Sequence, residues 1–187
     1  MTKLIIIRHG EPDYLQVTER GFKGHGRDLA SLTLAGIKQA KDVASDSRLD
    51  DAELIVSSPY TRALQTAAII SRHRDLDINI ELDLHEWLPD LTFNYDNDDI
   101  VKEAAKECTM FKGEYGEESM NWEKLSTVAD RSFKSLEKYL HYNKIIIVAH
   151  EVVMRQFKFE KTIPYCGIIE VDFDKDFKWN GWIEGEN

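Results

Sequence analysis

Two stretches of this chain follow one pattern, and each ends on a histidine. Residues 3–9 read Lys-Leu-Ile-Ile-Ile-Arg-His, and residues 144–150 read Lys-Ile-Ile-Ile-Val-Ala-His. Short apolar runs of this kind are typical of strands buried on both faces of a parallel sheet. Ligands of open α/β sheets bind beyond the carboxyl ends of the strands, so His9 and His150 are both predicted at that edge. A lone histidine is more often a satisfied strand-end residue, but two at matched strand ends, one beside an arginine, favour chemistry.

Strand-like and helix-like segments alternate along the remaining chain. The predicted helices are 33–46, 58–72, 96–111, 119–141 and 151–157, and the further predicted strands are 53–57 and 78–82, with a terminal hairpin of 167–173 and 178–183. Thr33 and Ser58 are the expected N-caps, and Pro59 suits the first helical position. This order predicts one α/β domain over residues 1–187, a three-layer α/β/α sandwich with a mostly parallel central sheet. The stretch 86–118 is the expected lid or insertion.

Composition narrows the class of partner. The 187 residues carry a formal net charge of −10, which disfavours nucleic acid and anionic membrane as partners but allows an anionic small molecule in a cleft lined by arginines. The two cysteines, Cys108 and Cys166, lie far apart and form no metal or redox motif. Met1 leads directly into the first predicted strand without a signal-peptide pattern, so a cytoplasmic protein is expected.

The residues at the two predicted strand ends suit a phosphate. Gly10 allows the backbone to turn sharply beside a ligand, and the planar fork of Arg8 matches phosphate oxygens. A permanent charge beside His9 disfavours protonation of the imidazole, and a neutral imidazole is a nucleophile. Arg62 falls in the first turn of the helix after the second strand, where free N–H groups also attract anions. Alone, Arg62 would be read as a surface salt bridge; with Arg8 it makes a two-arginine clamp.

Four blocks in order resemble the histidine phosphatase superfamily, the phosphoglycerate mutase-like family, on its shorter phosphatase branch. The blocks are Arg8-His9-Gly10-Glu11, then Leu32-Thr33 with Gly36 and Gln39-Ala40, then Ser57-Ser58-Pro59 with Arg62-Ala63 and Gln65-Thr66-Ala67, and last Val148-Ala149-His150. Arg-His-Gly alone is a weak signal, whereas all four blocks in order are a strong one. The resemblance covers nearly the whole chain.

The resemblance implies a metal-independent phosphomonoester hydrolase that needs no cofactor. His9 would be the nucleophile that becomes phosphohistidine, and His150 would hold the phosphoryl group together with Arg8 and Arg62. The family places a proton donor in a Leu-x-Glu context, which here is Leu84-His85-Glu86, so Glu86 is the expected general acid. Asp83 is the fallback, and a solvated loop carboxylate is the alternative interpretation of Glu86.

Three positions depart from the family pattern. Pro12 and Leu15 stand where the family often has threonine and asparagine, which leaves the details of the phosphate site open. Glu151 stands where a glycine usually follows the late histidine. Its backbone N–H can still contact phosphate, but its carboxylate would repel the phosphate unless it points away or pairs with a base. Glu151 is either an acidic residue favoured at a helix start or a residue that selects substrate.

A basic loop is the remaining candidate. Lys23, His25 and Arg27 are spaced to line one side of an extended chain and to reach the distal part of a substrate, or they form a solvated loop that balances an acidic protein. Two rival functions stay open: a phosphoglycerate mutase-type transferase, and a catalytically weak protein that binds a phosphorylated ligand. The substrate and the oligomeric state are not predicted; candidate substrates include sugar phosphates, nucleotide-derived phosphates such as α-ribazole phosphate, and phosphoproteins.

Overall fold

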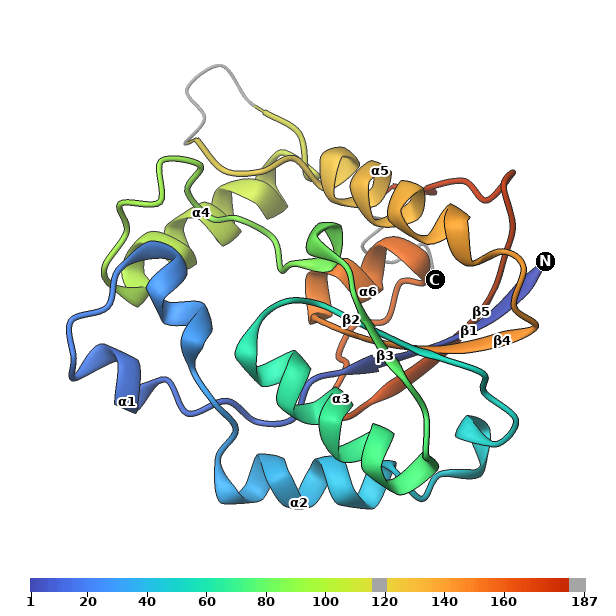
Figure 1. Ribbon diagram of the computed structural model, residues 1–187. Coiled ribbons are helices and arrows are strands. Elements are labelled where there is room, and N and C mark those ends of the chain that lie inside the picture. Colours follow the sequence, from blue (N-terminus) through green and yellow to red (C-terminus); the bar gives the residue numbers. More distant parts are fainter. Residues whose placement is uncertain (116–120, 182–187) are drawn as a thin grey trace.

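A five-stranded sheet forms the centre of the protein, as the computed structural model of residues 1–115 and 121–181 shows (Figure 1). The strand order is β3-β2-β4-β1-β5, with bounds Thr2–Arg8 for β1, Ile55–Ser57 for β2, Ile78–Ile80 for β3, Lys144–Ala149 for β4 and Ile168–Phe173 for β5. All neighbouring pairs are parallel except β1 with β5. The predicted three-layer α/β/α sandwich with a mostly parallel sheet is confirmed.

Helices cover both faces of this sheet (Figure 1). Helices α2 (Leu34–Val43) and α3 (Thr61–Arg74) pack against the face that carries Ile5 and Ile7. Helices α5 (Leu125–Leu136) and α6 (Glu151–Phe157) pack against the opposite face, which carries Leu4 and Ile6. Because successive strand residues face opposite sides, a strand that is apolar throughout supplies both cores. Each such buried side chain contributes about 1.5–3 kcal/mol to folding.

Helices and loops lie beyond the carboxyl ends of the strands, on the left of Figure 1. These are α1 (Leu15–Thr18), the 3₁₀ helix η1 (Gly24–Leu29) and α4 (Asp98–Met110); the other 3₁₀ helices are η2 (Ser47–Leu49), η3 (Leu82–Leu84) and η4 (Glu137–Tyr139). Trp122 is fully buried beside Trp87, with ring centroids 6.4 Å apart, and its indole N–H donates to Glu107 on α4. The described part of the stretch predicted as a lid, residues 86–115, is thus anchored to the core.

Two predicted helices begin later than expected. Helix α3 starts at Thr61, not at Ser58, because the Ser58 hydroxyl is engaged by His150 and does not cap the helix as predicted. The helix predicted from residue 119 starts at Leu125, and residues 119 and 120 lie outside the described residues. Residues 121–124 instead run beside the segment 88–91, bound through Glu123 N to Leu88 O and Leu91 N to Asn121 O.

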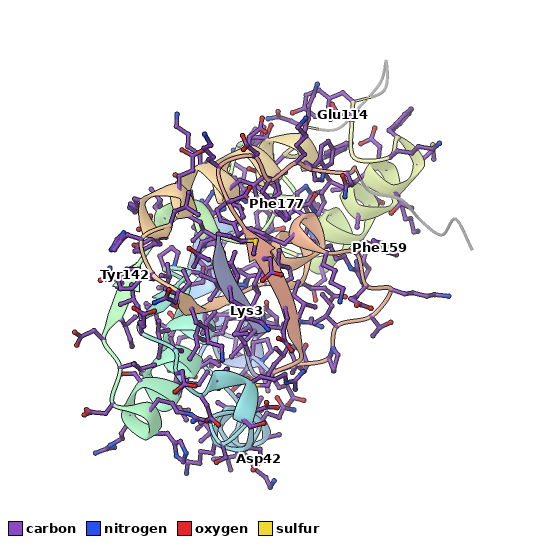
Figure 2. All side chains as sticks on the ribbon, turned by 90° about the vertical axis from the view of Figure 1, so that its right-hand side faces the viewer. Lys3, Asp42, Glu114, Tyr142, Phe159 and Phe177 are labelled. Atoms are coloured by element: carbon purple, nitrogen blue, oxygen red, sulfur yellow. The ribbon has the colours of Figure 1, made fainter. Side chains whose placement is uncertain are left out.

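The predicted terminal hairpin is wrong. Strand β5 pairs with β1, and residues 178–181 form no strand; residues 182 and 183 lie outside the described residues. The chain after β5 packs its aromatic rings onto the α5–α6 face: Phe177 stacks at right angles on Phe133, 5.0 Å between centroids. Figure 2 shows how densely side chains fill this region around Phe177. Residues after β5 therefore pack aromatic rings on the α5–α6 core in place of the second strand of the predicted hairpin.

Candidate active site

His9 and His150 meet at the carboxyl edge of the sheet. Arg8 is paired with Ala149 in the register of β1 and β4, so the two histidines follow neighbouring positions. Their ring centroids lie 5.1 Å apart, and the backbone N–H of His9 donates to the Ala149 carbonyl. His150 is fully buried and His9 is 4% exposed. The matched strand ends of the sequence therefore bring two imidazoles together.

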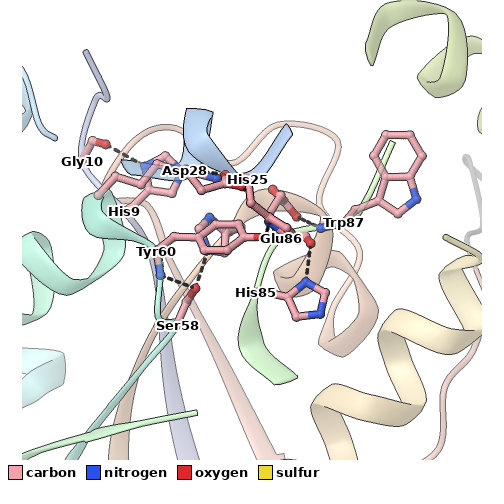
Figure 3. A network of polar contacts seen from close by, with 11 residues as sticks. His9, Gly10, His25, Asp28, Ser58, Tyr60, His85, Glu86 and Trp87 are labelled. Carbon is pink, nitrogen blue, oxygen red and sulfur yellow. Dashed lines mark hydrogen bonds and ion pairs between the residues drawn. The ribbon is translucent and has the colours of Figure 1, made fainter. Parts of the chain in front are cut away.

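Hydrogen bonds fix the tautomer of His9 (Figure 3). Its Nδ1 lies 2.7 Å from the Gly10 carbonyl oxygen, which can only accept, so Nδ1 carries the hydrogen. Nε2 then has a lone pair, and it accepts a hydrogen bond from Arg62 Nε at 3.2 Å. Burial, the Arg62 charge and the Arg8 charge together hold the pKa of His9 well below its usual value. The ring is neutral and nucleophilic at Nε2.

Glycine is required where the chain leaves His9. A Cβ on Gly10 would stand 2.6 Å from the carbonyl oxygen of Gly36, at the start of α2. The Gly10 N–H donates to the Thr66 hydroxyl on α3 at 3.0 Å, and the Glu11 N–H donates to the Gln39 side chain on α2 at 2.9 Å. Residues of the second and third sequence blocks thus hold the backbone that carries His9.

Arg62 is nearly buried and held by charge. It is 3% exposed, and its Nη1 forms an ion pair with Asp28 Oδ1 at 3.0 Å. Asp28 lies in η1 and also accepts from His25, whose ring stacks on Phe93 at 4.3 Å. Arg62 is therefore not the surface salt bridge that an isolated arginine would suggest.

Arg8 is held on the other side of His9. Its Nη1 lies 2.7 Å from Glu151 Oε2 and donates to the Ile163 carbonyl at 2.5 Å, and its guanidinium lies 4.4 Å from the centre of the Tyr165 ring. The second oxygen of Glu151 accepts from Arg155 at 2.5 Å. The Glu151 carboxylate therefore pairs with two bases, which is the arrangement that permits an acidic residue beside an anion site.

Two buried nitrogens beside His9 have no hydrogen-bond partner among the described residues. They are Arg8 Nε and His150 Nδ1. The other nitrogen of His150, Nε2, is 2.7 Å from the Ser58 hydroxyl, whose oxygen accepts from the backbone N–H of Tyr60 at 3.3 Å. A buried unpaired polar group costs about 1–3 kcal/mol, so an anion with several oxygens would satisfy these groups.

Glu86 lines a cavity of about 480 Å³ together with Arg62 and Tyr60. The backbone N–H of Trp87 donates to Glu86 Oε1 at 2.8 Å (Figure 3). Burial by the surrounding protein raises the pKa of this carboxyl, even though part of the residue faces the cavity. Asp83, the fallback candidate, is exposed and does not line the cavity. A carboxyl at a cavity wall whose pKa is raised suits a proton donor.

An arginine from α5 holds the segment that carries Glu86. Arg131 Nη1 donates to the carbonyl oxygens of Asp83 and His85, at 2.5 and 2.8 Å. Its Nε forms a buried ion pair with Glu123 Oε1 at 2.7 Å. No local spacing in the sequence predicts the roles of Arg131, Glu123 and Asp28, because each side chain binds a residue of another segment.

The basic loop is not the predicted extended chain. Residues 24–29 form η1, because the segment closes on the stretch before and within α4. Arg27 is buried and forms an ion pair with Asp98 while lining the cavity, and Lys23 pairs with Asp96 at 3.1 Å outside it. His25 is bound to Asp28 and Tyr60, each at 3.3 Å. The Arg27–Asp98 pair connects η1 to α4, and the Lys23–Asp96 pair joins the residues just before each helix.

Pro12 and Leu15, the two other positions that depart from the family pattern, precede this loop in the sequence. Pro12 forms an isolated antiparallel bridge with Leu32. Leu15 begins α1 and is 64% exposed. Neither side chain appears in the wall of the cavity.

Comparison with known proteins identifies the family. The profile of the histidine phosphatase superfamily (branch 1) matches residues 4–159. The chain belongs to this superfamily. It is 27% identical to phosphoserine phosphatase 1 of Hydrogenobacter thermophilus over 184 residues, covering 94% of this chain and 80% of that protein. It is 26% identical to the adenosylcobalamin/alpha-ribazole phosphatase of Escherichia coli, covering 81% and 75%.

Solved structures share the fold. A mycobacterial glucosyl-3-phosphoglycerate phosphatase in complex with VO3 superimposes with a TM-score of 0.71 at 18% identity, covering 97% of this chain and 99% of that one. An alpha-ribazole phosphatase from Shigella flexneri gives 0.66 at 23% identity, covering 94% and 93%. The predicted family and the prediction of a histidine-type phosphatase are confirmed. Within residues 1–115 and 121–181, no helix is long and apolar enough to cross a membrane, and no cluster of three metal-ligating side chains occurs.

Proposed function

We propose that this protein hydrolyses a small phosphomonoester without a metal ion, through a phosphohistidine formed at His9. One observation carries the proposal: the Nε2 lone pair of a neutral, buried His9 lies at the same edge of the sheet as Arg8 Nε and His150 Nδ1, two buried nitrogens without a hydrogen-bond partner among the described residues. A phosphoryl group placed there would receive a hydrogen bond from Arg8 Nε and charge from Arg8 and Arg62. It would receive a second hydrogen bond from His150 Nδ1 in the tautomer in which the Ser58 hydroxyl donates to His150 Nε2. Such preorganised charge stabilises the equatorial oxygens of the transition state.

The first step transfers the phosphoryl group to the protein. His9 Nε2 attacks phosphorus as the bond to the ester oxygen breaks, and protonated Glu86 gives its proton to the departing oxygen. The Gly10 carbonyl accepts from Nδ1–H and stabilises the positive charge that develops on the imidazole. Burial raises the pKa of Glu86, which favours the protonated form that this step needs.

The second step returns the protein to its starting state. Water attacks the phosphorus of the phosphohistidine, and the Glu86 carboxylate takes one proton from that water. The N–P bond breaks, so inorganic phosphate leaves, and Nε2 regains its lone pair. The proton that Glu86 lost in the first step is restored, and the cycle needs no metal or cofactor.

The small-molecule partner is part of the same proposal. A net charge of −10 disfavours nucleic acid, and the arginine pair supplies the local charge that a phosphomonoester needs. The relatives are named as phosphatases, which supports hydrolysis over a mutase-type transfer. A cytoplasmic location and a single domain with a lid at 86–118 remain predictions.

The test is phosphate release from p-nitrophenyl phosphate and a panel of natural phosphomonoesters in the presence of EDTA. Release by the wild-type protein is expected to persist with EDTA and to vanish in His9→Ala. A folded wild-type protein that binds phosphate but hydrolyses no ester would favour the ligand-binding alternative. Transfer of the phosphoryl group to phosphoglycerate in place of water would favour the mutase alternative.

A further inference from the structure

The cavity beside Glu86 and Arg62 is the space into which the leaving group of a substrate must extend. It measures about 480 Å³, within the range of small-molecule sites. Because Glu86 and Arg62 both lie in its wall and Arg62 Nε is 3.2 Å from His9 Nε2, an ester bound at His9 would extend its leaving group into this cavity. We call it the leaving-group cavity.

Apolar and aromatic side chains dominate the wall of this cavity. Its aromatic side chains are Tyr14, Tyr60, Trp87 and Tyr95. Aliphatic side chains such as Val101 and Ala105 of α4 complete the opposite part. Aromatic walls favour flat rings, which gain both apolar burial and ring contacts.

Every cation in the wall is already paired with a carboxylate. Arg27 pairs with Asp98, Arg62 pairs with Asp28 at 3.0 Å, and Lys102 pairs with Asp99 at 3.2 Å. A carboxylate on the leaving group would find no unpaired cation among the described residues of the wall and would meet the acidic side chains of Asp28 and Asp98. Desolvation of such a charge without a partner is unfavourable.

We propose that the leaving group of the substrate is uncharged and carries a planar aromatic ring; this rests on the proposed hydrolysis at His9. The ring lies against the aromatic wall. Because the cations of the wall are already paired, the carboxylate of a leaving group such as serine would have no counter-ion there. The cavity thus selects among phosphomonoesters by the neutrality and flatness of the alcohol.

The test compares primary alkyl esters, so that intrinsic reactivity stays similar. The substrates are 2-phenylethyl phosphate, ethyl phosphate and phosphoserine. We expect kcat/KM for the phenylethyl ester to exceed the other two by about tenfold or more, mainly through KM, as burial of an aromatic ring predicts. Equal or faster hydrolysis of phosphoserine, or no gain over ethyl phosphate, would overturn the proposal.

Binding of phosphonates separates this proposal from the proposed hydrolysis. In 3-phenylpropylphosphonate, propylphosphonate and 2-amino-4-phosphonobutanoate, a CH₂ group replaces the ester oxygen. Calorimetry is expected to show the tightest binding for the phenyl compound. If no ester is hydrolysed, hydrolysis at His9 is refuted, and the ratio of these dissociation constants still decides whether the cavity selects an aromatic ring.

A charged variant tests the wall directly. Ala105→Arg adds a cation at an exposed position of α4 that lines the cavity. It is expected to raise kcat/KM for phosphoserine relative to 2-phenylethyl phosphate by several-fold. Met110→Arg adds the same charge on the same helix at a residue that is 73% exposed and outside the cavity wall, and serves as the matched control. An unchanged ratio in Ala105→Arg, or the same change in both variants, would overturn the proposal.

Discussion

Arg8, the last residue of β1, forms an ion pair with Glu151, the first residue of α6 after the neighbouring strand β4. Arg8 Nη1 and Glu151 Oε2 are 2.7 Å apart. The carboxylate is shared with Arg155, so an acidic side chain sits beside the candidate phosphate site with its charge compensated. The pair occupies Nη1 of Arg8, while Nε of the same guanidinium stays unpaired among the described residues. Glu151 therefore both orients Arg8 and lowers the net positive charge that a phosphate would meet.

Removal of the Glu151 charge is expected to tighten phosphate binding. In Glu151→Gln, Arg8 keeps its bond to the Ile163 carbonyl and its stacking on Tyr165, so its position survives. Loss of one nearby negative charge favours an anion by roughly 1–3 kcal/mol at the effective dielectric of a partly buried site. Inorganic phosphate should therefore inhibit the variant at about tenfold lower concentration.

Glu160→Gln is the matched control, since it makes the same charge change on a residue that pairs with Lys158 instead. Its inhibition constant for phosphate is expected to match the wild type. Weaker phosphate binding in Glu151→Gln would show that the carboxylate matters more for holding Arg8 than for its charge.

Asp28 is expected to act through Arg62. Asp28→Ala removes the partner of Arg62 Nη1, whereas Asp28→Asn keeps an oxygen that can accept. Hydrogen bonds to charged groups contribute about 1.5–3 kcal/mol, so kcat/KM should fall about tenfold or more in Asp28→Ala and much less in Asp28→Asn. Steady-state kinetics of both variants, with unfolding in urea to check stability, measures the effect. Equal losses in the two variants would argue against a positioning role.

Arg131 is expected to be needed for both stability and catalysis. Arg131→Leu leaves Glu123 buried without its charged partner, which costs about 3–5 kcal/mol of unfolding free energy. The segment that carries Glu86 also loses the bonds to the carbonyls of Asp83 and His85, so kcat should fall in the protein that remains folded. Lys134→Leu on the exposed side of α5 should change stability by less than about 0.5 kcal/mol. A wild-type kcat in folded Arg131→Leu would contradict the expected role of Arg131 in catalysis.

Burial of neutral His9 makes stability depend on pH. Its folded-state pKa is well below the value of about 6.5 in an unfolded chain, so below that pH the unfolded chain binds a proton that the folded protein does not. The contribution of His9 to the free energy of unfolding is thus fully present above about pH 6.5. It falls as the pH falls, by up to about 1.4 kcal/mol per pH unit. His9→Asn should show a shallower slope in urea unfolding between about pH 7 and pH 5. The same replacement at the exposed His73 controls for the loss of an imidazole, and parallel slopes in His9→Asn and wild type would contradict the prediction.

The sequence predicted the parts of the site that lie on regular elements. Parallel strands end at one edge, so the pattern of residues 3–9 and 144–150 was enough to bring His9 and His150 together. The start of α6 at Glu151 and the cap of α2 by Thr33 were also predicted, because their signals are local. Local patterns suffice where the fold repeats a common geometry.

The rest depended on contacts between distant segments. The late start of α5 follows from hydrogen bonds of residues 121–123 with 88–91, which no periodicity reveals. The role of Asp28 is visible only once η1 lies against α3, and the pairing of Glu151 with Arg8 only once α6 lies beside the end of β1. Tertiary contacts decided these features over local propensity.

The most direct test of the account is the detection of a phosphoryl group on His9 during turnover. Wild-type protein mixed with a phosphomonoester and quenched within a turnover should carry one acid-labile, base-stable phosphoryl group, and peptide mass spectrometry should place it on His9. The adduct should accumulate in Glu86→Gln with an activated ester such as p-nitrophenyl phosphate, because the base for the second step is lost. Steady hydrolysis with no adduct at any quench time, or an adduct on a residue other than His9, would contradict the account.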